Sequence, residues 1–190
     1  MNHTRKGNYL QTHAGINFYP LDPRKEEVYI LDIAHALSLQ CRFNGFCNEF
    51  YSIAQHSILC AEYLKQKYND SALAFAGLLH DAAEAYCCDI PKPLKPFLTG
   101  YEEIEMRVHE VIMEKYVIDY TLTDYKFWTK IKEADNVMLA TESRDLMSCN
   151  AYERWGKNLA AALPDPIVPQ SWQDAEKSFM ETFERLLSCQ

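Results

Sequence analysis

Apolar residues recur every three or four positions along most of the chain, the spacing typical of α-helices, and few stretches alternate with the period of a strand. Asn44-Gly45, the prolines between 91 and 96 and those between 164 and 169 interrupt this pattern. The pattern predicts an all-α fold with helices over about 26–40, 53–68, 72–86, 101–116, 123–147 and from 171 onward.

Short polar side chains stand where these helices begin and are suited to cap them. Ser52, followed three residues later by Gln55, fits a capping box. Further cap candidates are Asp70 or Ser71, Thr123, and Ser171. The segment 72–86 is apolar on nearly all sides, so we expect it to occupy the centre of the fold.

The 190 residues are 48% hydrophobic and 24% charged, which is ordinary for a globular protein with one sizeable core. Because no internal repeat or linker divides the chain, we expect a single domain over residues 1–190. The net charge of −8 argues against binding of polymeric nucleic acid, since an acidic surface repels polyanions. Small anions can still bind where cations gather locally.

The seven cysteines are odd in number and form no CxxC pair, which favours a reducing compartment over a disulfide framework. The N-terminal stretch is polar, unlike a signal peptide, and the apolar run 72–79 is too short to span a bilayer. The sequence therefore predicts a cytoplasmic protein with no membrane partner.

A His80-Asp81 dipeptide lies inside the apolar segment 72–86. Composition alone predicts roughly 0.35 His-Asp dipeptides by chance, so the dipeptide suggests a function only because its surroundings are apolar. Two ionisable side chains in an apolar helix are costly to bury unless they are paired or bind a metal. Glu84, one turn further on the same helix face, could accept a proton from water, and Asp89 could protonate a leaving oxygen.

Two further candidate ligands, His56 and Asp135, lie on separate predicted helices. Asp135 is on the face that we expect to point inward, together with Ile131, Met138 and Glu142. With His80 and Asp81, these residues offer two nitrogens and two carboxylates. That set suits a divalent ion such as Mn, Co, Fe, Ni or Zn, with positions left for water and a phosphate oxygen.

The order of His56, His80-Asp81 and Asp135 on successive helices resembles the H…HD…D signature of the HD-domain metal-dependent phosphohydrolases. The resemblance covers about residues 18–145 and implies an HD-domain helical bundle. It also implies that these four residues hold one divalent metal ion, for which Co, Mn, Ni, Fe, Zn and Mg are all candidates.

The region after the dipeptide is similar to the same region of bacterial 5′-deoxynucleotidases, which implies that Glu84 and Asp89 are catalytic. The segments 18–23, 32–38 and 41–43 are similar to a phage and prophage branch of this superfamily, to which phage dATP triphosphohydrolases are related. The implied activity is hydrolysis of 2′-deoxynucleotides, either dNMPs or dNTPs such as dATP. Relatives of this kind are commonly homo-oligomers.

The resemblance also implies substrate-binding residues. Arg42 corresponds to an arginine that contacts the phosphate, and Phe43 stands where the deoxynucleotidases carry a tryptophan against the sugar or base. An arginine offers a fixed fork of donors suited to phosphate. Lys92 and Lys95, between the prolines, could add positive charge.

Simpler readings remain open for these residues. Arg42 could form a structural ion pair with Glu142 or Asp32, His56 alone could be a hydrogen-bonded core residue, and Phe43 could be core. The alternative functions are an HD hydrolase of a signalling nucleotide, or a nucleotide sensor that retains the pocket without catalysis.

Overall fold

Local sequence signals set the start of three helices at the predicted positions. Ser52 Oγ accepts a hydrogen bond of 3.1 Å from the backbone N–H of Gln55, at the start of α2 (Ile53–Tyr68). Asp70 caps α3 (Ser71–Leu78), and Ser171 caps α8 (Trp172–Leu187). The Gln55 side chain does not complete a capping box, because its amide instead binds the backbone of Val168 and Gln170.

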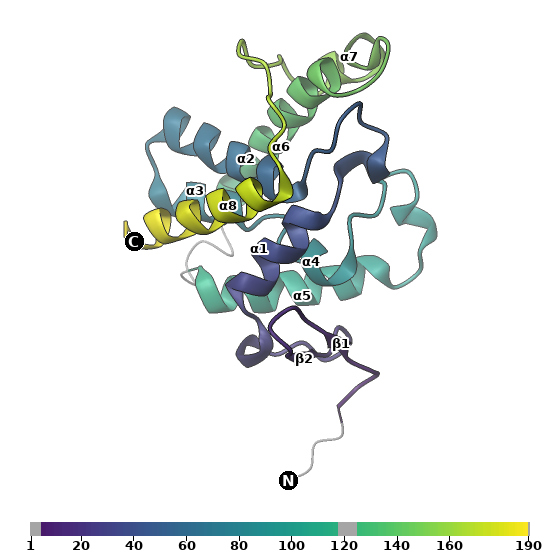
Figure 1. Cartoon of the computed structure of the whole chain (residues 1–190), viewed down its shortest axis with the longest axis vertical. Coiled ribbons are helices and arrows are strands. Elements are labelled where there is room, and N and C mark those ends of the chain that lie inside the picture. The colour runs from purple at the N-terminus through teal and green to yellow at the C-terminus, as the bar shows by residue number, and fades with distance from the viewer. Residues whose placement is uncertain (1–4, 118–124, 190) are drawn as a thin grey trace.

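The computed structural model describes residues 5–117 and 125–189, and helices dominate both ranges (Figure 1). The remaining helices are α1 (Ile30–Leu39), α4 (Glu84–Cys87), α5 (Tyr101–Tyr116), α6 (Tyr125–Asp145) and α7 (Ala151–Arg154). Short 3₁₀ turns lie at Lys25–Glu27, Arg42–Gly45, Lys95–Phe97 and Gly156–Asn158. The all-α prediction is confirmed. The predicted cap Thr123 lies outside the described residues.

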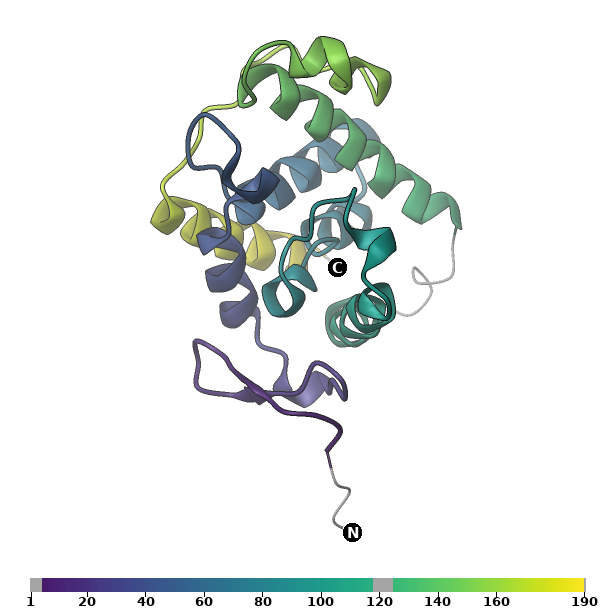
Figure 2. The same cartoon turned by 90° about the vertical axis from the view of Figure 1, so that its right-hand side faces the viewer.

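A small antiparallel hairpin precedes the helices. It pairs β1 (Leu10–Gln11) with β2 (Asn17–Phe18), with Leu10 opposite Phe18, and lies at one end of the molecule in both views (Figures 1 and 2). The ring of Phe18 stacks on that of Tyr86 at 3.9 Å between centroids, which joins the hairpin to the helical core. The first predicted helix is shorter than expected, since residues 25–27 form a separate turn and Val28 is extended.

The prediction of one helix over 72–86 is wrong. The chain leaves the α-helix after Leu78, passes through turns over residues 79–83, and resumes as α4. Bonds to the third residue back replace the helical pattern, as from Glu84 N–H to Asp81 carbonyl at 3.0 Å. His80 Nδ1 lies 2.7 Å from the carbonyl oxygen of Gly77, so its side chain satisfies a carbonyl at the end of α3.

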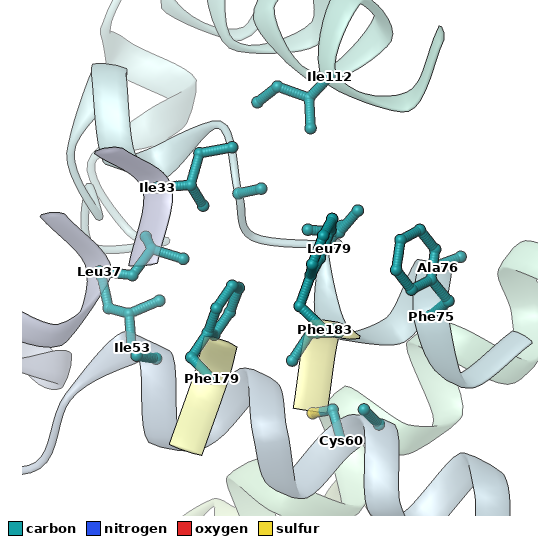
Figure 3. Close-up of a cluster of buried hydrophobic side chains, with 14 of the residues drawn as sticks. Ile33, Leu37, Ile53, Cys60, Phe75, Ala76, Leu79, Ile112, Phe179 and Phe183 are labelled. Atoms are coloured by element: carbon teal, nitrogen blue, oxygen red, sulfur yellow. The ribbon is translucent and has the colours of Figure 1, made fainter. Parts of the chain in front are cut away.

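The core forms where α8 packs against α1, α2 and α3. Figure 3 shows Phe179 and Phe183 of α8 among side chains of these helices. The ring centroids of Phe75 and Phe183 lie 5.1 Å apart. Phe179, Phe183 and Leu186, spaced three and four residues apart along α8, are all buried. A Cβ at Gly77 would lie 2.3 Å from the Cδ1 methyl group of Leu64 on α2, so a larger residue there would displace this buried side chain.

Among the described residues, no helix is both long and apolar enough to cross a membrane. All seven cysteines lie in the described ranges and are free thiols.

Candidate metal centre

The four predicted ligands come from three elements and meet in the interior. His56 lies on α2, His80 and Asp81 on the 79–83 turn, and Asp135 on α6. His56 Nε2 is 3.6 Å from Asp81 Oδ2 and 3.5 Å from Asp135 Oδ1. His80 Nε2 is 3.2 Å from Asp81 Oδ1, and the two imidazole rings lie 5.3 Å apart. The fold therefore brings all four together, although three helices and a turn separate them in sequence.

The orientation of His56 is set by a second partner. Its Nδ1 lies 2.6 Å from Oε1 of Glu142, which is fully buried on α6. This contact turns Nε2 toward the two aspartates and toward Cys60 Sγ, which is 3.5 Å away. A carboxylate behind a histidine fixes the ring in the way that metal-binding histidines are commonly held.

Glu142 also anchors Arg42. It accepts a hydrogen bond of 2.9 Å from the Tyr51 hydroxyl and one of 3.2 Å from Nη2 of Arg42. The other terminal nitrogen of Arg42, Nη1, lies 3.5 Å from Oδ2 of Asp81. Although burial opposes the charged form, Arg42 and His56 hold the pKa of Glu142 below its usual value. The ion pair of Arg42 with Glu142 that the sequence left open therefore forms, whereas Asp32 accepts from the backbone of Ala14.

Both aspartates are charged at neutral pH. Burial would raise their pKa values, but His80 and His56 hold that of Asp81 far below its usual range. The pKa of Asp135 is lowered in the same way, against burial, by its hydrogen bond with His56 and by the neighbouring charges, including Lys132. Ionised carboxylates are the form that binds metal ions.

The donor set fits a metal ion. Ligand atoms of His56, Cys60 and His80 lie within 4.8 Å of one another, and this group could hold a metal. Two atoms bound to one ion at about 2.1 Å lie roughly 3 to 3.5 Å apart, close to the separations between His56 and the aspartates. Burial raises the pKa of the Cys60 thiol, which favours the ionised carboxylates as ligands over this cysteine. The buried Nε2 of His80 lies 3.2 Å from Asp81 Oδ1 but forms no hydrogen bond of acceptable geometry to any described residue, so both atoms can face one ion.

A cavity of about 240 Å³ opens beside His80 and Asp81. It is lined also by Glu84, Lys95, Glu105 and His109, among others. Glu84 begins α4 and is buried, and its Oε2 has no hydrogen-bond partner in the described part of the chain. Burial, followed by the negative charges of Asp81 and Asp89, raises the pKa of Glu84 well above its usual value. A carboxyl group with a raised pKa accepts a proton more readily than an exposed one, a property common among catalytic acids and bases.

The chain is 38% identical to the uncharacterized protein YfdR of Escherichia coli strain K12 over 180 residues, which cover 94% of this chain and 96% of YfdR. It belongs to the YfdR family. An uncharacterized protein of Rhodobacter capsulatus is 30% identical over 156 residues, which cover 78% of this chain and 76% of that protein. No family model matches the chain.

The other predicted site residues of this YfdR-family chain lie at different depths. Asp89 is half-buried, and burial raises its pKa. Phe43 is also half-buried, with its ring 5.5 Å from the Arg42 guanidinium carbon and 6.3 Å from Trp155. Lys92 is exposed, while Lys95 of the same loop lines the cavity and binds Glu105 at 2.9 Å.

Two residues near the candidate metal centre were not predicted from the sequence. Cys60 stands four residues after His56, and this spacing alone could have placed both on one helix face. His109 lies on α5, far from the other site residues in sequence, and no local pattern marks it. Burial lowers the pKa of His109 to about 4, so it is neutral at physiological pH.

Proposed function

We propose that this chain is an HD-type, divalent-metal-dependent phosphohydrolase that acts on 2′-deoxynucleotides. The substrates would be dNMPs, as for a 5′-deoxynucleotidase, or dNTPs such as dATP. The observation that supports this most is that Nε2 of His56 faces the carboxylates of both Asp81 and Asp135. The residues of the H…HD…D pattern thus converge from three elements around the buried imidazole of His56.

His56, His80, Asp81 and Asp135 would hold one divalent ion, with Co, Mn, Ni, Fe, Zn and Mg as candidates. Such an ion supplies positive charge that polarises a phosphate and makes water a better nucleophile. The acidic net charge of the chain is then partly offset at the site itself.

Glu84 would move the proton in this reaction. Glu84 lines the cavity, its pKa is raised, and its Oε2 has no hydrogen-bond partner among the described residues, which suits a group that takes a proton from water. Asp89 contributes to the raised pKa of Glu84, and its own pKa is raised by burial. It could therefore give a proton to the leaving oxygen.

Arg42 would steady negative charge on the phosphate. It contacts Asp81 directly, and Glu142 holds its guanidinium in place. A pre-positioned cation of this kind stabilises the charge of a phosphoryl transition state without reorganisation.

The test is a hydrolysis screen of the full chain after chelation and supplementation with each candidate metal. The substrates are dNMPs, dNTPs, their ribose counterparts, and cyclic or guanosine polyphosphate nucleotides, with phosphate, triphosphate and nucleoside detected. We expect turnover of a deoxynucleotide with at least one metal. Turnover only of signalling nucleotides would support the alternative hydrolase, and nucleotide binding without any turnover would support the sensor.

A matched pair of variants checks the ligand assignment. Asp135→Asn should lose both bound metal, measured after dialysis, and turnover, because an amide is a poor ligand for the ion. Glu133→Gln makes the same change two residues earlier on α6, where Glu133 binds Tyr63 and Tyr68 instead. This control should retain both properties.

A further inference from the structure

Cys41 and Cys47 flank the turn that carries Arg42 and Phe43. Their Sγ atoms lie 3.4 Å apart, and both side chains are half-buried. A disulfide bond requires a separation of about 2.05 Å, so closure needs an approach of roughly 1.4 Å. No large rearrangement separates the two thiols from a bond.

The backbone holds both cysteines near each other. Cys41 forms an isolated bridge with Ser52, before α2, and Cys47 forms one with Met147, after α6. Between them, Phe43, Asn44 and Gly45 all have positive φ angles of 54°, 53° and 77°. Three consecutive residues with left-handed backbone angles turn the chain sharply between the two cysteines.

We infer that Cys41 and Cys47 are a covalent modification site, at which a peroxide oxidises the two thiols to a reversible intramolecular disulfide. In the first step, the sulfur of one cysteine attacks a peroxide oxygen, the O–O bond breaks, and a sulfenic acid and one water form. In the second, the other sulfur displaces hydroxide from the sulfenic acid, the S–S bond forms, and the second water leaves. The two thiols lose two electrons and two protons, which the peroxide gains.

The surroundings keep Cys47 in its thiol form before oxidation. The Cys47 thiol donates toward the carbonyl oxygen of Arg42 at 3.7 Å. Burial, together with the hydrogen bond to Cys41, raises the pKa of Cys47 to about 11, so it stays a thiol. Either sulfur can make the first attack on the peroxide, and the other then displaces hydroxide from the sulfenic acid.

Oxidation of the full chain with hydrogen peroxide, followed by alkylation, trypsin and mass spectrometry, tests this directly. Because trypsin cleaves after Arg42, the disulfide would join peptide 26–42 to peptide 43–65 with the loss of two hydrogens. We expect this linked pair to appear and to separate with dithiothreitol. Its absence at a peroxide concentration that oxidises the exposed Cys149 overturns the inference.

Three variants identify the partners, since peptide 43–65 also contains Cys60. Cys41→Ser should abolish the linked pair, and Cys47→Ser should leave a sulfenic acid on Cys41 that dimedone traps. Cys88→Ser removes an exposed thiol elsewhere and should change nothing. A linked pair that survives in Cys47→Ser would place the bond at Cys60 and overturn the assignment.

A second readout rests on the proposed function. The turn carries Arg42, and a displacement of about 1 Å in a positioning group can cost a hundredfold in rate. We expect the crosslinked chain to lose about tenfold in kcat/KM for the deoxynucleotide, with recovery in dithiothreitol and no such loss in Cys47→Ser. Unchanged turnover in the crosslinked chain overturns the coupling to Arg42. The mass measurement needs no activity, so failure of the proposed function is recognised separately.

Discussion

Two buried glutamates near Asp81 behave in opposite ways. Glu142 has Arg42, His56 and Tyr51 as partners, and its pKa is lowered. Glu84 faces the cavity with an unpartnered Oε2 among the described residues, and its pKa is raised.

The difference shows how burial alone does not decide what a carboxyl group does. Desolvation opposes the charge on both glutamates, and only the neighbours of Glu142 compensate for it. The region around Glu142 therefore holds charged groups in place, whereas the region around Glu84 leaves a carboxyl group that binds a proton more readily than an exposed glutamate does. The first region is suited to positioning and the second to chemistry.

The largest expected effect comes from removing the carboxyl group of Glu84 beside the cavity. Glu84→Gln should lower kcat for the deoxynucleotide by a factor on the order of 10² to 10⁴, since a general base contributes about this much. The unfolding free energy should stay the same or rise, because a neutral amide replaces a poorly solvated acid. Steady-state kinetics and urea unfolding measure the two quantities.

Glu102→Gln is the control, since Glu102 lines the same cavity but is exposed. It should keep both turnover and stability. A Glu84→Gln enzyme with full activity would contradict the role of Glu84 in accepting a proton from water.

Replacing Glu142, the paired glutamate, should change the unfolding free energy of the chain. Glu142→Gln leaves Arg42 and His56 buried without their anionic partner, which should lower the unfolding free energy by about 3 kcal/mol. For a chain of this size, the midpoint of thermal unfolding should fall by roughly 6 to 12 °C. Urea and thermal unfolding provide the measurement.

Glu181→Gln, an exposed change on α8, supplies the matched control and should shift stability by less than about 0.5 kcal/mol. If Glu142→Gln were as mild as this control, the network around Glu142 would not hold the region together.

The smallest effect concerns pH and the cavity residue His109. Its pKa in the folded state is about 4, against 6.5 for a free histidine, so below pH 6.5 the unfolded chain binds a proton that the folded chain does not. Stability should therefore fall as the pH drops from 6.5 toward 4 and be unaffected by this group above 6.5.

Comparison with His109→Gln isolates this contribution from other titrating groups. As the pH falls from 7 to 5, the unmodified chain should lose about 2 kcal/mol of unfolding free energy that the variant does not lose. Parallel pH profiles for the two proteins would argue that His109 is solvated in the folded state.

Helix starts were predictable because a cap is a contact between residues three apart, as at Ser52, Asp70 and Ser171. The single helix over 72–86 was wrong for a related reason. His80 bonds the carbonyl of Gly77 and Asp81 reaches His56 and Arg42, so these polar contacts are made from turns instead of a continuous helix. Apolar periodicity does not register such contacts.

By itself, the sequence determined the all-α class, most helix boundaries and the inward face of α6 that carries Asp135 and Glu142, since each depends on residues within one or two helical turns. The tertiary structure decided which glutamate is paired and which is not. It also brought His109 and Lys95 to the cavity and set Cys41 beside Cys47. These outcomes depend on distances between elements and on desolvation, which exist only after the helices have packed.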